Sequence, residues 1–335
     1  MQSVRLFLFV FIFLSFLSKR NSSHGDGHDA ALELENARHV IASFFGCKDH
    51  ELVFTSNASE SNRIALTMGR GRACCVATDH SSVLHNVEHR IRVDRCGQID
   101  LYHLEATFKS LQPLLFSFCY GNNETGVLVD NLDAVVALRD QWAPRCLLHC
   151  DLSQSFGKVR VDHLLRIVDL ATISAHKLHG PKGVGGLFVR EKLRIEEFQG
   201  TPSVALILGF ANAVKLALSS GLFDYASVKQ HLVARLQEIA NVRINPTSSE
   251  VPILSVHVAN VDSSQLVRLL STKYKLMCSS GSACSKQKTS HVLLAMGLHA
   301  HESVRISFCR TTTRREVDEL IERFKAGIEE IKSSK

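Results

Sequence analysis

The chain has 335 residues, 45% of them hydrophobic and 21% charged, which is the composition of a globular protein with room for two domains. Its 39 lysines and arginines outnumber its 33 aspartates and glutamates only slightly, and the excess is spread along the chain without a basic run. This charge distribution argues against nucleic acid as a partner and suits small anionic ligands.

The first predicted element is an apolar stretch close to the N-terminus. Residues 6–17 read LFLFVFIFLSFL and follow an early arginine, a pattern that resembles a secretory signal peptide. The stretch is too short to span a membrane comfortably, and no A-x-A cleavage pattern follows it. We therefore treat residues 1–20 as a separate apolar segment, either signal-like or a shortened first helix, and we expect no membrane span.

Short apolar strands alternate with helical stretches along the next part of the chain. The predicted strands cover residues 51–56, 73–78, 113–120, 146–152 and 168–174, and residues 79–91 are predicted to be helical. This alternation predicts an α/β fold with a mostly parallel sheet sandwiched by helices. From residue 253 onward, strands and helices predict a smaller α+β unit. We place a large domain at 21–235 and a small C-terminal domain at 236–335.

The ten cysteines are scattered, and most lie in apolar runs. No pair has the spacing of a zinc finger or zinc ribbon, and Cys146, His149 and Cys150 belong to a predicted buried strand, so we expect no metal ion. Unpatterned cysteines in a chain of this length are typical of a reducing compartment. This favours the cytoplasm over secretion, with the mitochondrion as the alternative.

Polar side chains follow five predicted strands at the point where each strand ends. They are Ser59, His80, Asn123, Asp151, Gln154, Ser174, His176 and Lys177. In an open parallel sheet, ligands bind beyond the carboxyl ends of the strands, so these residues predict a binding site. Lys177 is either a solvated charge or an amine that forms a Schiff base. A Schiff base would suit pyridoxal 5'-phosphate (PLP), which also needs an acid against its pyridine nitrogen and donors for its phosphate.

Eight stretches carry a family resemblance. They are residues 51–62, 79–86, 121–129, 149–162, 169–189, 279–285, 290–298 and 303–321. The most specific are the lysine motif SAHKLHGPKG, the SGSAC loop and an Arg-x-Ser motif. In this order they resemble the class V aminotransferase-fold (fold type I) PLP enzymes of the cysteine desulfurase and selenocysteine lyase group. The resemblance implies a homodimer that binds PLP, acts on cysteine or selenocysteine, and can pass sulfur to an acceptor protein.

The resemblance also implies a role for each residue of the site. Cofactor-binding roles fall to Ala58, Ser59, His80, Asn123, Asp151, Gln154, Ser174, His176, Lys177 and Thr201. Among these, Lys177 binds the cofactor covalently, Asp151 pairs with the pyridine nitrogen, and His80 stacks on the ring; Lys177 and His80 are also catalytic. Arg305 and Asn123 bind the substrate, with the Arg305 guanidinium on its carboxylate.

The third catalytic residue that the resemblance implies is Cys284, which accepts the sulfur. Small and polar residues surround it, and Lys286 and Lys288 nearby favour its thiolate form. The rival nucleophile is Cys278, which lies at a predicted strand end and does not match the family motif.

Two departures from the family pattern leave alternatives open. The family's first strand has no counterpart, and the segment 190–200 is shorter than the Gly-rich loop that helps to close the site across a dimer. Thr201, which follows this segment, matches the residue that reaches the PLP phosphate of the neighbouring subunit. We expect a cysteine desulfurase; the alternatives are a selenocysteine lyase and a non-catalytic homologue that serves as a binding or dimerisation partner.

Overall fold

The computed structural model of this chain describes residues 25–193, 201–219, 221, 224–281 and 289–334. The apolar segment 1–20 and Cys284 lie outside the described residues. Within these ranges, no helix has both the length and the apolar character to cross a membrane. The chain divides into two compact units, residues 1–67 with 148–222 and residues 68–147 with 223–335. The domain boundary expected at 235/236 stays a prediction.

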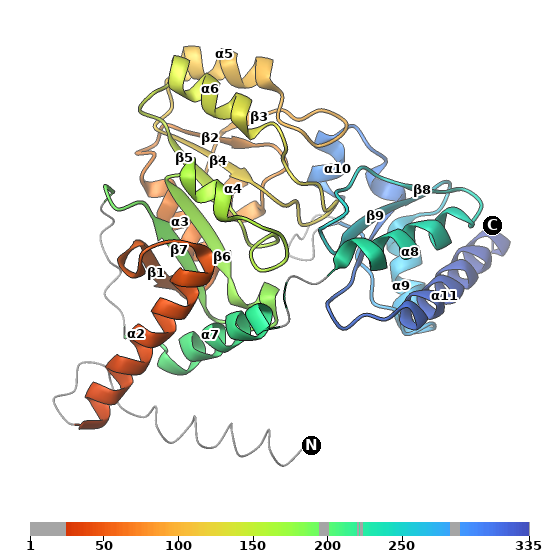
Figure 1. The fold of residues 1–335 in the computed structure, drawn as a ribbon. Coiled ribbons are helices and arrows are strands. Elements are labelled where there is room, and N and C mark those ends of the chain that lie inside the picture. The colour runs from red at the N-terminus through yellow and green to blue at the C-terminus, as the bar shows by residue number, and fades with distance from the viewer. Residues whose placement is uncertain (1–24, 194–200, 220, 222–223, 282–288, 335) are drawn as a thin grey trace. The chain divides into compact units, whose positions relative to one another are not determined.

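The main sheet contains seven described strands in the order β1-β7-β6-β5-β4-β2-β3 (Figure 1). In that order they are Leu52–Thr55, Gly185–Val189, Leu170–Ser174, Leu147–Asp151, Leu115–Cys119, Ala73–Val76 and His89–Ile91. The pairs β5–β6, β4–β2 and β2–β3 are parallel, whereas β7 runs antiparallel to both of its neighbours. The predicted α/β fold with a mostly parallel sheet and flanking helices is confirmed.

The five predicted strands agree with β1, β2, β4, β5 and β6 to within two residues at each end. They were recognisable because they are buried; every residue of β6, for example, is buried. The helical prediction for residues 79–91 was wrong, since helix α4 covers only Ser81–Leu84 and residues 89–91 form β3. β3 lies at the edge of the sheet with His89 and Arg90 exposed, so its sequence carries no apolar run.

In the first unit, long helices pack beside the strands. Its described helices are α2 (Gly25–Phe45), α3 (Ala58–Thr67) and α7 (Val204–Ser219), with 3-10 turns η1 (Asp49–Glu51), η2 (Asp162–Arg166) and η3 (Ala175–Leu178). α2 and α7 lie side by side, and α3 packs on β6 and β7 (Figure 1). Phe45 meets Phe156 and Phe188 edge to face, with ring centroids 5.3 and 6.0 Å apart. These aromatic contacts hold the end of α2 in place.

The second unit adds a small antiparallel sheet in the order β10-β9-β8. Its further elements are α4, α5 (Leu101–Leu111), α6 (Leu132–Trp142), α8 (Tyr225–Gln237), β8 (Val242–Ile244), β9 (Ile253–Val258), α9 (Ser263–Thr272), α10 (His291–Ala295), η4 (Ala300–Glu302), β10 (Ser303–Ser307) and α11 (Arg314–Ser333). Side chains of α8, α9 and α11 share one apolar core with the small sheet, in which Phe324 is fully buried. Thr313 and Glu316 form a capping box that starts α11.

Candidate active site

The strand ends of the first unit bring several predicted site residues into register. Asp151 at the end of β5 is paired with Thr172 on β6, and Ser174 at the end of β6 is paired with Gly185 on β7. Gly185 in turn is paired with Thr55 on β1. Neighbouring strands lie about 4.8 Å apart, so the polar ends of β5, β6 and β1 form one row.

Gly185 also allows the chain that enters α3 to come close to this row. A Cβ at Gly185 would lie 2.9 Å from the carbonyl carbon of Asn57 and 3.0 Å from the nitrogen of Ala58, which leaves no room for a side chain. Ala58 and Ser59, the first residues of α3, therefore lie next to the strand that pairs with Ser174. A helix N-terminus with serine hydroxyls beside it suits a phosphate group.

Asp151 is buried, and its carboxylate is held from two sides. Asn62 on α3 donates a 2.9 Å hydrogen bond to Oδ2, and the backbone N–H of Ser153 donates a 2.9 Å bond to Oδ1. These bonds fix the direction of the carboxylate at the end of β5. Asn62 was not among the predicted site residues, although it lies one helical turn after Ala58 on the same helix.

His176 and Lys177 occupy η3, directly after β6, and both are exposed. The Ser174 hydroxyl lies 2.9 Å from Nδ1 of His176. Desolvation lowers the pKa of His176, and the positive charges of Lys177, Lys182 and Lys158 lower it further. The lysines around this imidazole create a positive potential that suits an anionic ligand.

Gln154 is buried one turn after β5 and pairs with a lysine that the sequence analysis missed. Nζ of Lys158 donates a 3.0 Å hydrogen bond to Oε1 of Gln154. Because Oε1 faces Lys158, the NH₂ group of the amide points away from this lysine and can act as a donor. Desolvation, followed by the charge of Lys177, lowers the pKa of Lys158 to about 7. The sequence feature that could have indicated Lys158 is its position four residues after Gln154.

The residues of the first unit fit PLP. Its phosphate suits the start of α3 with Ser59 and Ser174, and its pyridine nitrogen suits the oriented, buried carboxylate of Asp151. The amide of Gln154 suits the ring oxygen, and the exposed amine of Lys177 suits the aldehyde. This donor set has one group for each chemical feature of the cofactor.

In the second unit, His80 follows β2 and caps α4. Its Nδ1 accepts a 3.2 Å hydrogen bond from the backbone N–H of Ser82 and lies 2.8 Å from the Ser82 hydroxyl, so the ring has one orientation. The preceding residue, Asp79, is buried and accepts hydrogen bonds from the backbone N–H groups of Val76 and Cys119. Asp79 thus ties the turn that carries His80 to the ends of β2 and β4.

Asn123 and Arg305 meet in the second unit, although 182 residues separate them in the sequence. Nη1 of Arg305, on β10, donates a 3.0 Å hydrogen bond to the carbonyl oxygen of Asn123. Asn123 lies in a tight turn in which Oδ1 of Asn122 accepts hydrogen bonds from the backbone N–H groups of Glu124 and Thr125. The two predicted substrate-binding residues are therefore brought together.

The same turn depends on Gly126. Its φ is +75°, and a Cβ there would lie 2.5 Å from the carbonyl oxygen of Ile253 on β9. We expect Gly126→Ala to destabilise the protein by at least about 1 kcal/mol more than Gly71→Ala does. Gly71 is the matched control because its φ is +78° with nothing within 4 Å of a built Cβ. Urea unfolding of both variants measures the difference, and equal losses would contradict the prediction.

The cysteine loop has a described stem. Ser279 and Arg305 form an antiparallel bridge, with backbone hydrogen bonds of 3.1 and 2.6 Å, and the Ser279 hydroxyl donates to the carbonyl oxygen of Gly281. Cys284 itself lies outside the described residues. Burial raises the pKa of the rival Cys278 to about 12, which keeps it a thiol at neutral pH. Thr201 is exposed.

The sequence matches the family model Aminotransferase class-V over residues 15–199 and 194–320. The chain belongs to the class V aminotransferase family. Enzymes of this family depend on PLP, in agreement with the donor set at the ends of β5 and β6. The family resemblance inferred from the sequence motifs is therefore confirmed.

Relatives of this member of the class V aminotransferase family are named cysteine desulfurases. It is 34% identical to the cysteine desulfurase IscS of Aeromonas salmonicida (strain A449), over 91% of this chain and 84% of that protein. It is 32% identical to the cysteine desulfurase IscS of Vibrio vulnificus (strain CMCP6), over 95% of this chain and 87% of that protein.

Solved structures of NifS-like proteins have the same fold as this chain. A NifS-like protein from Rickettsia africae ESF-5 superposes with a TM-score of 0.87 at 25% identity, over 97% of this chain and 96% of that one. A second NifS-like protein gives a TM-score of 0.80 at 30% identity, over 95% of this chain and 92% of that one. The fold is therefore shared along nearly the whole length of both chains.

Proposed function

We propose that this chain is a PLP-dependent cysteine desulfurase that converts L-cysteine to L-alanine. The carbon–sulfur bond of cysteine breaks, the sulfur joins the thiol of Cys284 as a persulfide, and a proton takes its place on the carbon. The supporting observation is the row formed by Asp151, Ser174 and the start of α3, next to Lys177, in a chain aligned with named cysteine desulfurases. PLP, when bound, supplies an electron sink for this chemistry.

Each site residue has a separate role in this proposal. Lys177 would hold the cofactor and move protons at the reacting carbon, and Asp151 would keep the pyridine nitrogen charged. His80, with its ring oriented by Ser82, would take the stacking role that the family resemblance implies. Cys284 attacks the substrate sulfur as a thiolate.

Arg305 binds the carboxylate of the substrate in this proposal. Its bond to the Asn123 carbonyl orients the guanidinium, and a charge-assisted hydrogen bond contributes about 1.5–3 kcal/mol. We expect Arg305→Ala to raise KM for cysteine about ten- to a hundredfold, measured by alanine release at varied cysteine concentration. Arg243→Ala, which removes an exposed arginine from β8 in the same small sheet, is the control and should leave KM unchanged. A similar rise in both variants would argue for a general loss of stability.

We further propose a homodimer in which Thr201 contributes to the phosphate site of the neighbouring subunit, and a sulfur-acceptor protein that takes the persulfide. The proposed location is the cytoplasm, with the mitochondrion as the alternative, because the reaction needs a reduced thiol at Cys284. Light scattering tests the dimer. A monomer that binds PLP tightly would contradict it.

The proposed activity is tested by incubating purified, PLP-loaded protein with cysteine or selenocysteine. Alanine is measured in both cases, with sulfide or selenide as the second product. Alanine and sulfide from cysteine, in the presence of a thiol reductant, are the expected result. Alanine from selenocysteine alone would identify a selenocysteine lyase. Bound PLP without alanine from either substrate would identify a non-catalytic homologue.

A further inference from the structure

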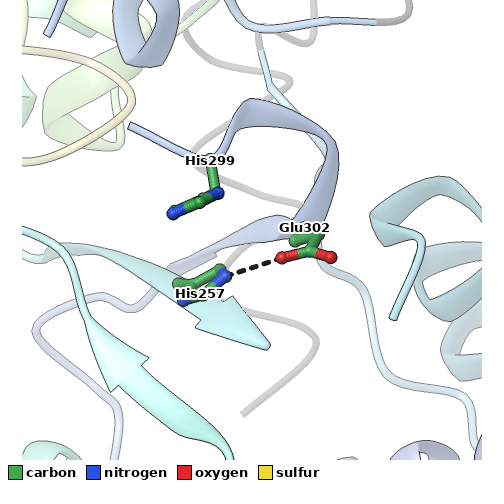
Figure 2. A group of neighbouring side chains, drawn as sticks. All are labelled: His257, His299 and Glu302. Carbon is green, nitrogen blue, oxygen red and sulfur yellow. Dashed lines mark hydrogen bonds and ion pairs between the residues drawn. The ribbon is translucent and has the colours of Figure 1, made fainter. Parts of the chain in front are cut away.

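A second cluster of side chains lies on the small antiparallel sheet of the second unit. His257 comes from β9, His299 precedes η4, and Glu302 ends η4 (Figure 2). One ligand-type atom of each residue lies within 4.8 Å of those of the other two. None of the three has a role in the proposed desulfurase reaction.

The carboxylate of Glu302 is held in place. Its Oε2 lies 2.8 Å from Nε2 of His257 (Figure 2). Its Oε1 accepts a 3.1 Å hydrogen bond from the backbone N–H of Asn260. Asn260 has a φ of +63°, a conformation that asparagine tolerates better than most residues. The turn after β9 therefore directs one oxygen of Glu302 toward His257 while the other is bonded to the backbone.

The two imidazole rings are in contact. The rings of His257 and His299 are stacked, with centroids 4.7 Å apart and an angle of 17° between their planes. The Ser303 hydroxyl donates a 2.7 Å bond to the His299 carbonyl oxygen and accepts a 3.1 Å bond from Nδ2 of Asn245. The backbone beneath His299 is thus anchored, while its side chain is exposed.

We propose that His257, His299 and Glu302 bind a divalent transition-metal ion of the Zn²⁺ type. Two imidazole nitrogens and one carboxylate oxygen are a common Zn²⁺ ligand set, whereas Mg²⁺ and Ca²⁺ select oxygen ligands. The ion takes the place of the direct contact between Nε2 of His257 and Oε2 of Glu302. His299 completes the set by turning its ring about the Cβ–Cγ bond, a torsion with broad minima. The fourth position is left for water or for a group from another molecule.

The position of the cluster indicates which part of the fold a bound ion would stabilise. His257 on β9 is paired in register with Ser303 on β10, and Arg305, two residues later on β10, is paired with Ser255, two residues earlier on β9. An ion on His257 and Glu302 joins β9 to the turn that starts β10. Because the assembled site exists only in the folded chain, binding stabilises the strand pair that carries Arg305.

The test uses PLP-loaded protein without an affinity tag, stripped of metal with a chelator, and titrated with Zn²⁺ in a calorimeter. The variants are His299→Ala and Glu302→Gln. His301→Ala is the matched control, because His301 is an exposed histidine of the same turn, with its Nε2 3.5 Å from Oγ1 of Thr289. We expect one tight Zn²⁺ per chain in the wild type and the control, and at least about tenfold weaker binding in both variants.

A second readout distinguishes this site from cysteine thiols, which also bind Zn²⁺. Co²⁺ bound by nitrogen and oxygen ligands gives visible absorption without the intense near-ultraviolet charge-transfer bands of thiolate ligands. We expect this visible absorption in the wild type and its loss in His299→Ala. Equal Zn²⁺ affinity in all four proteins, thiolate bands only, or no binding at all would each overturn the proposal. His299 is exposed, so its replacement leaves the fold intact.

Discussion

Lys177→Ala is expected to lower the rate of alanine formation from cysteine by at least about 10²–10⁴-fold, the contribution of one positioned proton-transfer group. The amine of Lys177 is proposed to hold the cofactor covalently as well as to move protons, so the variant loses both functions. The rate is measured by alanine release. Mass spectrometry after borohydride reduction should find the cofactor on the peptide that contains Lys177 in the wild type and not in the variant.

Lys192→Ala is the matched control for this experiment. Lys192 is an exposed lysine in the turn after β7, and it should tolerate alanine with no change in rate or in cofactor attachment. If the Lys177 variant still carries cofactor attached to a lysine, another residue of the chain is the attachment site. Lys158, the half-buried neighbour with its pKa lowered to about 7, would then be the first residue to examine.

Cys284→Ser is expected to lower sulfide release from cysteine by about 10³-fold or more, because the substrate sulfur loses its nucleophile. PLP binding and cysteine binding should stay unchanged, since neither is assigned to Cys284. The measurement combines sulfide and alanine release with a persulfide assay on the protein after cysteine is added without reductant. The wild type should label at one thiol and the variant at none.

Cys278→Ser is the variant to compare with Cys284→Ser. Burial raises the pKa of Cys278 to about 12, so its thiolate is scarce at neutral pH, and serine there should leave persulfide formation intact. A loss in Cys278→Ser with full activity in Cys284→Ser would exchange the roles of the two cysteines. Full activity in both variants would show that sulfur leaves without a protein nucleophile from this loop.

The chain order of the strands and of most proposed site residues was predictable because buried strands are apolar runs that end in polar turns. Asp151 and Ser174 stand at such ends, and the structure places them where β5 and β6 stop. Asn62 and Lys158 were missed because each acts through a partner. Asn62 bonds to Asp151 across 89 residues of sequence. Lys158 bonds to Gln154 from a short turn that has no apolar pattern.

The sequence by itself determined the family, the positions of five strands of the main sheet and the residue types at their ends, since these depend on local apolar patterns and on short motifs. Only the tertiary structure decided that β7 runs antiparallel between β6 and β1, which brings Ser174 next to the start of α3. It also decided that His257 meets Glu302 across 45 residues of sequence. Both depend on strand register and turn geometry, which are set by long-range packing and leave no periodic signal in the sequence.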